Sequence, residues 1–394
     1  MKGLYVSNFD PQNSIGYKFK ISGQVKGFRD LGSDVDLICF DDSSQVLLTY
    51  FDRQSEQILK SRVLAAPSSN LLKRRLNLLK AAISHISIAP PDFLYLRYPR
   101  SEPLYLFFLA RVRKLFPSLI ILCEFPTYPY DKEYKGVSGI KDRFVFFVDK
   151  ITRRFLKQFI NRAVSINYEL PIFGIDTISI DNGIDVSSYL LIPESSDLSD
   201  VINIIGVANV SLWHGYDRVI KGLGEYYRQD SDSRPKVIFH IVGARLPYLD
   251  ELRELVSQEN VVHSVVFHEP RQGKSLDSLF MNCHLAVGVL GGHRKGLETM
   301  SPLKNREYCA RGIPFIFSHV DPDFPEDFKY CLRTTSDESP VSIQNLISFI
   351  SQLSREDGVA SKMRDYANSS LEWAVKLKPV QAYIDDQVKK LSCG

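Results

Sequence analysis

The stretch "SPLKNREYCARGIPFIFSH", residues 301–319, decides how the second half of this chain folds. Pro302 suits the first turn of a helix, where its missing N–H costs nothing, and Ser301 is then placed as the N-cap. The glycine of "ARGIP" ends the helix, and the apolar run "IPFIFS" that follows reads as a buried strand. A helix leading directly into a short buried strand is typical of a parallel sheet covered on both faces.

The same alternation of short apolar runs and longer helical patterns extends along the whole chain. We predict two doubly wound α/β domains in tandem, each with a parallel, Rossmann-like sheet, followed by a helical end. The polar stretch "PESSDLSD" marks the boundary between the two domains. The predicted domains are 1–190 and 191–372, with a last helical segment over 373–394.

Composition limits the class of protein further. The 394 residues are 44% hydrophobic and 24% charged, which is typical of soluble globular domains. No window approaches the ~18 apolar residues of a membrane span, and the start lacks the apolar core of a signal peptide. The six cysteines are scattered without a C-x-x-C pair, which favours a reducing compartment. We therefore expect a cytoplasmic protein, and leave open its association with the inner face of a membrane.

Charge is divided unevenly along the chain. Residues 1–190 hold 26 Lys and Arg against 19 Asp and Glu, whereas the remainder holds 23 against 27. Two basic segments, "LLKRRLNLLKAAI" (71–83) and "FVFFVDKITRRFLKQFINR" (144–162), have amphipathic character. Both could lie on an anionic bilayer, and both could instead pack on the sheet with a solvated basic side. We favour packing.

The loop "HRKGLETMSPLK" (293–304) is expected at the carboxyl edge of the second sheet, where ligands of open α/β folds bind. The free N–H groups of the helix that follows would attract a phosphate. Glu307, one turn into that helix, could accept two hydroxyl hydrogens, as a ribose diol offers. The alternative is an ordinary capped surface helix. The cations expected around the phosphate are His293, Arg294, Lys295 and Lys304.

Several segments, in the same order, resemble family-4-type glycosyltransferases of the GT-B fold. "SPLKNREYCARGIPFI" is similar to that family's "SPLKLFEYMAxGxPVV", and "WHGYDRVIKGL" is similar to "KGxDxLIxAL". "ISIDNGID" resembles its Asn-Gly-Val/Ile-Asp turn. "NSSLEWAVKLKPVQAYID" resembles the closing helices, which in that family cross back onto the first domain.

The resemblance implies transfer of a sugar from a nucleotide diphosphate sugar, with retention at the anomeric carbon, to a glycan or lipid-linked acceptor, in surface polysaccharide synthesis. It implies no metal and no cofactor, and it identifies no catalytic side chain. Nucleic acid is not expected as a partner. Glu307 matches the glutamate that holds the donor ribose. The other residues expected at the donor are Lys304, Leu303, Pro302, Ser301, Met300, His214, Gly215, Arg294, Lys295 and, from the first domain, Gly16.

This chain departs from the family pattern at three positions. Thr299 stands where the family has a first glutamate, with Glu298 one residue out of register, and Val207 and His214 replace an arginine and a lysine. These losses keep two alternatives open. One is a non-catalytic subunit that binds and stabilises a partner transferase, and the other is a nucleotide-sugar epimerase or hydrolase.

The sequence gives fewer signals for the acceptor-binding residues, which are expected in the first domain. "CEFPTYPYDKEYKG" follows a buried strand, and its carboxylates and aromatic rings suit contacts with a sugar or a lipid head group. We name Glu124, Tyr128 and Tyr130 as acceptor-binding candidates, against the alternative of a structural loop. Three Asp-x-Asp pairs also occur, and we expect none to bind metal. They are Asp34/Asp36, Asp230/Asp232 and Asp321/Asp323.

Overall fold

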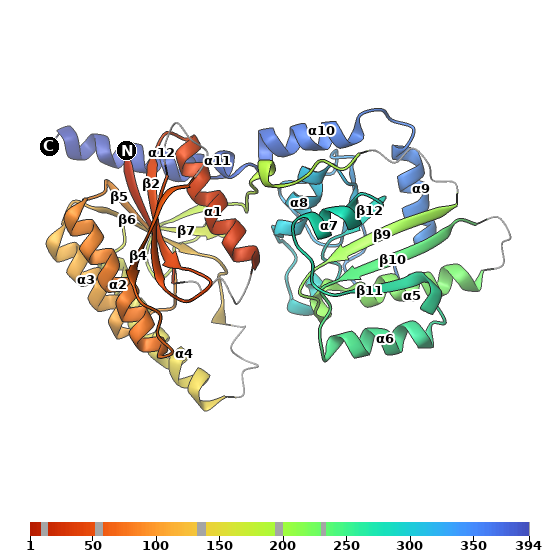
Figure 1. Ribbon diagram of the computed structural model, residues 1–394, viewed down its shortest axis with the longest axis horizontal. Coiled ribbons are helices and arrows are strands. Elements are labelled where there is room, and N and C mark those ends of the chain that lie inside the picture. Colours follow the sequence, from red (N-terminus) through yellow and green to blue (C-terminus); the bar gives the residue numbers. More distant parts are fainter. Residues whose placement is uncertain (9–14, 52–57, 132–138, 194–199, 230–233, 394) are drawn as a thin grey trace. The chain divides into compact units, whose positions relative to one another are not determined.

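The computed structural model describes residues 1–8, 15–51, 58–131, 139–193, 200–229 and 234–393. They form two compact units (Figure 1). The first comprises Met1–Asp185 together with Trp373–Gly394, and the second comprises Val186–Glu372. The two units are therefore divided a few residues before the boundary expected at 190, and the last segment belongs to the first unit from residue 373 on.

The first unit is built on an eight-stranded sheet with the order β4-β3-β2-β1-β5-β6-β7-β8. Strands β2, β1, β5, β6, β7 and β8 pair in parallel, as a doubly wound fold requires. The strands are β1 (Lys2–Val6), β2 (Asp34–Phe40), β3 (Val46–Phe51), β4 (Ile58–Ala65), β5 (Phe93–Arg97), β6 (Ile120–Phe125), β7 (Arg162–Ile166) and β8 (Thr177–Ile180).

An antiparallel edge on this sheet was not predicted from the sequence. The Asp41 carboxylate accepts hydrogen bonds from the backbone N–H groups of Ser43 (2.9 Å) and Gln45 (2.8 Å). This tight turn folds β3 back against β2, and β4 then pairs antiparallel with β3. Strand β4 was not predicted, because its sequence, "ILKSRVLA", mixes charged and apolar residues.

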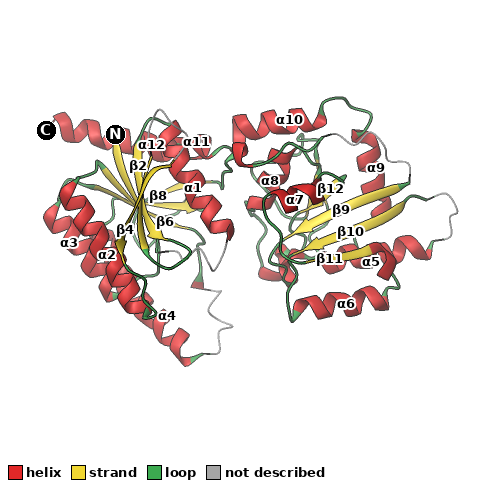
Figure 2. Ribbon diagram, viewed as in Figure 1, coloured by secondary structure: helices red, strands yellow, loops and turns green. Residues whose placement is uncertain are grey.

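Helices cover both faces of the first sheet (Figure 2). Figure 1 shows α2, α3 and α4 on one face, where Leu79 and Phe108 join the main core of the unit. On the other face, Phe28 of α1 packs against Phe93 and Tyr95. The helices are α1 (Ile15–Asp30), α2 (Leu71–Ile88), α3 (Pro103–Leu115), α4 (Ile140–Thr152), α11 (Trp373–Lys376) and α12 (Lys378–Cys393), with the 3-10 helix η3 (Arg153–Gln158).

The C-terminal segment is held to the first unit by the side chain of Trp373. The residue is fully buried, and its backbone N–H donates to the carbonyl of Ile184 (3.2 Å). Gly23 and Gly27 of α1 make room for it, since a Cβ on Gly27 would lie 2.8 Å from atoms of Trp373. Only glycine at these positions allows α11 to approach α1 so closely.

The second unit contains a six-stranded, fully parallel sheet with the order β11-β10-β9-β12-β13-β14. This is the strand order of a Rossmann-like domain, and the predicted fold class is confirmed for both units. The strands are β9 (Val201–Val207), β10 (Lys236–Val242), β11 (Val265–His268), β12 (Leu285–Val287), β13 (Phe315–Phe317) and β14 (Cys331–Arg333).

Two helical layers enclose the second sheet as well. Helices α5, α6 and α9 share one core, whereas Phe280 of α7 and Tyr308 of α8 pack with Phe315 on the opposite face. No helix within the described residues is long and apolar enough to cross a membrane. The helices are α5 (Tyr216–Arg228), α6 (Tyr248–Gln258), α7 (Lys274–Phe280), α8 (Leu303–Arg311), α9 (Ile343–Leu353) and α10 (Val359–Tyr366).

The close fit of Trp373 gives a direct test of how the C-terminal segment is held. Trp373→Ala should lower the free energy of unfolding by about 3–5 kcal/mol, because it leaves a cavity facing two glycines. Leu391→Ala, in the same segment but 54% exposed, is the matched control and should change it by less than about 0.5 kcal/mol. Urea unfolding measures both. Equal effects would show that α11 does not anchor the segment.

Candidate functional site

The carboxyl edge of the second sheet is formed by loops that hydrogen-bond to one another. After β12, the chain passes through the 3-10 helix η7 (Gly292–Lys295) and returns to α8. Met300 donates its N–H to the carbonyl of Val320 (3.0 Å), and Val320 donates to the carbonyl of Glu298 (2.8 Å). The loop before α8 is thereby tied to the segment after β13.

A second short helix, η5 (Leu212–His214), lies against this loop. Leu290 donates its N–H to the carbonyl of His214 (3.0 Å). Gly215 has φ +70°, and a Cβ there would lie 2.8 Å from the backbone of Leu290. Gly215, predicted at the donor, therefore has a structural reason to be glycine, and it brings His214 to the carboxyl edge.

Helix α8 begins one residue later than expected. Pro302, not Ser301, is the N-cap, with an extended ψ of 135°, and no side chain caps the helix. The prediction of Ser301 as N-cap was therefore wrong, because Pro302 in this extended conformation cannot be part of the first helical turn. Asn305 donates its N–H to the carbonyl of Pro302 (3.2 Å), so among the described residues the N–H groups of Leu303 and Lys304 are the ones left for an anion.

Lys304, in the first turn of α8, has a partly buried ammonium group with no carboxylate in close contact. Its Nζ lies 3.5 Å from the hydroxyl of Tyr216 and 5.6 Å from the centre of that ring. Burial lowers the pKa of Lys304 to about 7, and the negative charge of Glu307 opposes this shift only in part. A cation removed from water with no close carboxylate is a site that an anionic ligand would stabilise.

Glu307 is oriented by a residue that sequence reasoning missed. Its Oε1 accepts a hydrogen bond from Nε of Arg311 (2.9 Å), and Arg311 also donates to Asp277 of α7 (2.7 Å). The Arg311 guanidinium lies over the rings of Phe280 (4.5 Å) and Tyr189 (5.1 Å). The spacing of four residues between Glu307 and Arg311 is the one signal that could have revealed this pair.

His214 does not supply the positive charge for which it was a candidate. Its Nδ1 accepts a hydrogen bond from the backbone N–H of Ser211 (3.0 Å). Burial, reinforced by the charge of Lys304, lowers the pKa of His214 to about 2. The ring is therefore neutral at physiological pH, and it can offer a ligand only the N–H of Nε2.

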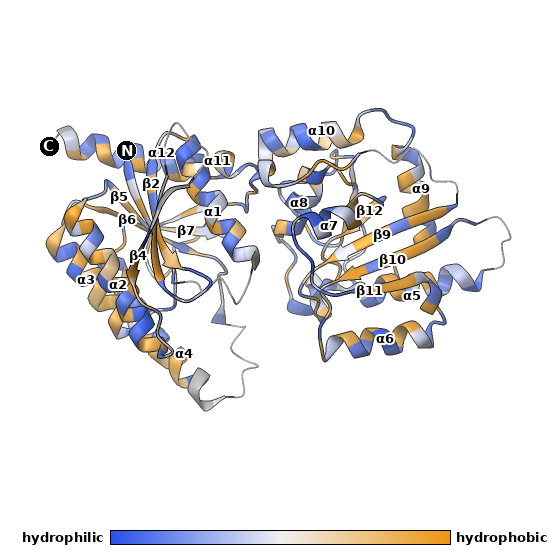
Figure 3. Cartoon of the chain, viewed as in Figure 1, coloured by the Kyte–Doolittle hydropathy of each residue, from blue (hydrophilic) through white to orange (hydrophobic). Residues whose placement is uncertain are grey.

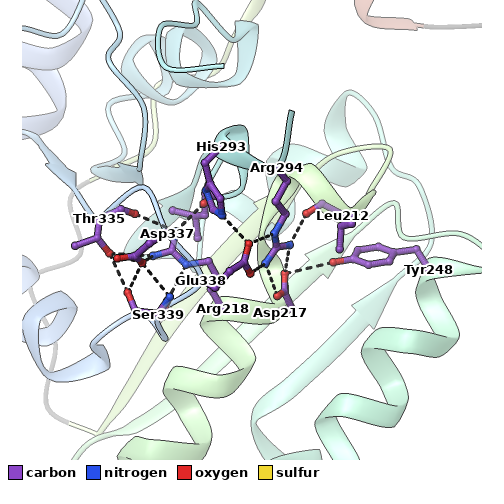
Figure 4. Close-up of polar contacts among 11 residues, drawn as sticks. Leu212, Asp217, Arg218, Tyr248, His293, Arg294, Thr335, Asp337, Glu338 and Ser339 are labelled. Carbon is purple, nitrogen blue, oxygen red and sulfur yellow. Dashed lines mark hydrogen bonds and ion pairs between the residues drawn. The ribbon is translucent and has the colours of Figure 1, made fainter. Parts of the chain in front are cut away.

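Arg294, the second candidate cation, already has all five of its N–H groups paired (Figure 4). Its Nη1 and Nη2 atoms donate to the two oxygens of Asp217 at 2.8 and 2.7 Å. The remaining donors bind both oxygens of Glu338 and the carbonyl of Leu212. Any contact between Arg294 and a phosphate would require one of these bonds to break.

Arg218 holds the neighbouring loop in the same way. Its five donor contacts reach the carbonyls of Ser339 (2.7 Å), Leu290 (2.6 Å) and Thr335 (3.0 Å) and the side chains of Thr335 and Asp337 (Figure 4). The side chain is fully buried. Arg218 thus joins the end of β12 to the loop after β14, and it serves structure rather than ligand binding.

The last basic candidate, Lys295, is exposed at the rim. Its Nζ lies 4.3 Å from the ring centre of Trp213, and that ring in turn stacks on His214 at 3.8 Å. The cation–π contact leaves the three N–H groups of Lys295 able to donate elsewhere. Lys304 and Lys295 are therefore the two predicted cations that do not already pair with a carboxylate.

The Asp321/Asp323 pair has a role that sequence reasoning missed. Both carboxylates accept from Arg306, which is fully buried, with Nη2 of Arg306 2.7 Å from Oδ1 of Asp321. Asn305 donates to Asp321 as well (3.0 Å). The pair therefore fixes α8 to the segment after β13. Of the other pairs, Asp36 contacts His85 (3.1 Å), and Asp230/Asp232 lie outside the described residues.

In the first unit, Glu124 lies at the end of β6 and is fully buried. Its oxygens accept from Lys20 (3.0 Å), Arg97 (3.0 Å), Gln24 (2.6 Å) and Tyr95 (2.9 Å). Burial alone would raise the pKa of Glu124, but the two cations outweigh it and hold the pKa at about 2. Contact with an acceptor, which stays a prediction, would require one of these partners to leave.

The other first-unit candidates differ in accessibility. Tyr130 is buried and donates to Asp149 (2.7 Å), whereas Tyr128 is half-buried against the ring of Tyr168 (4.7 Å). Gly16 lies in the first turn of α1, and a Cβ there would meet no atom within 4 Å. Of these predicted contacts, Tyr128 and Gly16 are the ones open to a ligand.

A separate cavity, open to solvent, lies at the opposite, amino edge of the second sheet. Residues just before β12 and β13, such as Cys283 and Ile313, line it. Two acids line it, Glu356 and Asp357, and Glu356 is already paired with Lys329 (2.7 Å) and Lys362 (2.8 Å). The cavity is mostly apolar and lies away from Lys304 and Glu307, so it adds nothing to their chemistry.

No family model matches the sequence, and no curated protein matches it either. Solved structures do match. Sucrose-phosphate synthase from Thermosynechococcus elongatus is 12% identical with a TM-score of 0.62, and all of both chains is covered. Anabaena HepE, in complex with UDP and glucose, is 16% identical with a TM-score of 0.57 and the same coverage.

The lipopolysaccharide outer core galactosyltransferase WaaB is 12% identical with a TM-score of 0.55, covering 98% of this chain and 100% of that one. At these identities the likeness establishes the fold. The chain consists of two Rossmann-like domains of the GT-B type, as predicted.

The lowered pKa of Lys304 predicts how anion binding depends on pH. Since the pKa lies far below its usual value, the charge is lost as the pH rises through about 7, and binding must then take up a proton. We compare the affinity of the natural protein for inorganic pyrophosphate with that of Lys304→Arg. The ratio of the two affinities should fall between about pH 6 and pH 8.5, by up to tenfold per pH unit above the pKa of Lys304. Calorimetry at both pH values measures this.

The ratio between the two proteins cancels the titration of pyrophosphate itself. Lys295→Arg is the matched control and should leave the pH dependence unchanged, because Lys295 is exposed. A ratio between the natural protein and Lys304→Arg that stays constant with pH would exclude Lys304 from the anion site.

Proposed function

We propose that this protein is a retaining glycosyltransferase. It would move a hexose from a nucleotide diphosphate sugar to a hydroxyl of a glycan or lipid-linked acceptor in surface polysaccharide synthesis. One observation carries the proposal. The first turns of α8 hold both the ammonium of Lys304, which has no close carboxylate partner, and the carboxylate of Glu307, which Arg311 orients. The GT-B fold and the resemblance of the "SPLKNRE" segment agree with this assignment.

In the proposed complex, the diphosphate lies at the start of α8. The N–H groups of Leu303 and Lys304 in the first turn and the ammonium of Lys304 would stabilise the charge that develops on the leaving phosphate. We infer that this arrangement acts without a metal ion. Met300, Ser301, Pro302 and Leu303 form the approach to that helix, so they would lie beside the phosphates and the sugar.

Glu307 would hold the ribose. Arg311 occupies one of its oxygens, and no described residue donates to the other, so a diol could bind there. No side chain is assigned as the catalytic base. In a retaining reaction of this type the leaving phosphate would accept the proton of the acceptor hydroxyl.

We assign the acceptor to the first unit, with Tyr128 and Gly16 as its most accessible predicted contacts. A lipid-linked acceptor would be presented at a membrane surface, and we infer that the protein works there from the cytoplasmic side. The excess of basic residues in the first half of the chain supports attraction to an anionic leaflet.

One set of observations favours a second candidate, a non-catalytic GT-B subunit that stabilises a partner transferase. Thr299 replaces the first glutamate of the family pattern, Val207 replaces its arginine, and the replacement for its lysine, His214, is neutral. Such a subunit would not need to bind a nucleotide diphosphate tightly. Titration with UDP and GDP therefore separates the two candidates.

Glu307→Ala is the sharpest variant for this test. It should weaken binding of the cognate nucleoside diphosphate at least about 30-fold, since two charge-assisted hydrogen bonds to the diol are lost. Glu298→Ala, exposed and one residue out of register, is the control and should bind as the natural protein does. Calorimetry measures all three. Undiminished affinity in Glu307→Ala would refute the ribose assignment, and no binding to the natural protein would favour the subunit.

A further inference from the structure

Helix α4 and the 3-10 helix η3 carry a row of exposed apolar side chains on the first unit. Phe144 is 65% exposed, Phe147 59%, Ile151 41% and Phe155 43%. They recur every three to four residues, so they form one stripe along the outer side of the segment. Three phenylalanines on a single exposed helical face are unusual unless another surface covers them.

The inner side of the same segment is fully used by the fold. Asp149 is buried and accepts from the hydroxyl of Tyr98 (2.7 Å) and the backbone N–H of Ser101 (2.7 Å). Leu156 is also fully buried, in the main core of the unit. These contacts fix the rotation of α4, so the phenylalanines cannot turn inward without breaking them.

The charges beside the stripe have one sign. Arg143, Lys150 and Arg154 are exposed, and none forms an ion pair with a described residue. Lys150 lies over the ring of Phe146 at 4.6 Å. Among the side chains described from Arg143 to Gln158, the one acid is Asp149, which faces inward. Among the described side chains of this segment, the exposed ones are thus apolar or cationic, and the acid beside them, Asp131, is paired with Arg153 (2.7 Å).

Helix α3 extends this face, since it lies beside α4. Ser101, just before α3, contacts Asp149 of α4, and Arg113 near its end donates to Asn161 beyond η3 (2.9 Å). Figure 3 shows apolar and polar residues alternating along the layer formed by α2, α3 and α4. On α3, Phe107 is 67% exposed, and Arg111, Lys114 and Leu115 complete the same outer stripe.

Helix α2 does not show the same pattern. Leu79 is buried, Leu76 and Ile83 are half-buried, and Leu72 is exposed at the start of the helix. The apolar side of α2 thus packs mainly on the sheet, as favoured from the sequence. The second basic segment (144–162) differs from α2. Its inner apolar side packs in the core, whereas its outer apolar side stays exposed.

We propose that the outer face of α3, α4 and η3 docks on an anionic lipid bilayer. We call this face the α3–α4 face. Its phenylalanines would enter the head-group region while its lysines and arginines contact lipid phosphates. The inference rests on the proposed function for its purpose, since it places the protein where a lipid-linked acceptor is found.

Charge complementarity selects the bilayer over a second copy of the chain. In a symmetric dimer the same patch meets itself, so this face would bring its exposed arginines and lysines together, while the described acid beside them, Asp131, is already paired with Arg153. An anionic leaflet supplies the opposite charge and an apolar layer at the depth of the aromatic rings.

Co-sedimentation of the full chain with vesicles tests the proposal. The protein should bind phosphatidylcholine vesicles that contain phosphatidylglycerol and not those of phosphatidylcholine alone. Phe144→Ser/Phe147→Ser should lower the partition coefficient at least about tenfold, because two inserted rings are lost. Arg143→Gln/Lys150→Gln/Arg154→Gln should lower it on anionic vesicles and weaken its dependence on salt.

The matched control is Leu246→Ser/Leu391→Ser, which removes two side chains of similar exposure (70% and 54%) elsewhere on the surface. It should bind vesicles as the natural protein does. All variants should keep the natural unfolding midpoint, because the changed side chains are exposed. Vesicle binding by Glu307→Ala should also be unchanged, so loss of donor binding and loss of membrane binding are told apart.

Three outcomes would overturn the proposal. The first is a natural protein that does not sediment with anionic vesicles, and the second is a double phenylalanine variant that binds as well as the natural protein. The third is a concentration-dependent dimer in sedimentation velocity that the phenylalanine variant abolishes, which would assign the α3–α4 face to a second copy of the chain.

Discussion

Buried guanidinium groups must have their N–H donors paired, and the carboxyl edge of the second sheet depends on that constraint. Arg218 and Arg294 each make five donor contacts to the loops around β12, α5 and β14. Arg306 adds a pair of carboxylates that ties α8 to the segment after β13. Releasing any of these groups would leave a charge in a poorly solvated place, at a cost of several kcal/mol.

Because the arginines are paired, Lys304 is the partly buried cation of the site that has no carboxylate partner among the described residues. The neighbouring arginines have their partners and His214 is neutral, so an incoming anion meets one partly buried ammonium and the start of α8. A ligand that binds to such a site does not have to displace a carboxylate from the cation. Binding at this site depends on pH, because Lys304 must be protonated. A site made of several arginines would not show this dependence, since arginine stays charged.

The basic first unit complements this arrangement. Its cations are used in two ways: Lys20 and Arg97 are buried around Glu124, whereas Arg143 and Lys150 of α4 are exposed beside apolar rings. The buried pair stabilises the carboxyl end of β6. The exposed set is oriented by Asp149 and its partners, so interior hydrogen bonds determine what the surface presents.

Sequence reasoning was most successful where the information is local. The parallel strands, the two Rossmann-like units and the helix that carries Lys304 and Glu307 follow from periodicity and turn residues within a few positions. The cap at Ser301 failed by one residue, which is the usual uncertainty of helix ends. Strand β4 was missed because its pattern is not uniformly apolar.

Contacts between distant positions could not be predicted. Arg294 meets Asp217 across 77 residues, and Glu124 meets Gln24 across 100. Nothing in the local sequence says that these side chains are already paired, so Arg294 and Glu124 were taken as ligand candidates. Burial also sets the charge of His214, and burial is a property of the fold rather than of the tripeptide around it.

Hydrogen–deuterium exchange of the full chain, with and without a saturating nucleoside diphosphate, tests the central claim most directly. The account predicts that slowed exchange is concentrated at the carboxyl edge of the second sheet, in residues 288–307 and 211–216. Slowed exchange confined to the amino-edge cavity around Cys283 and Ile313, or none anywhere, would contradict it.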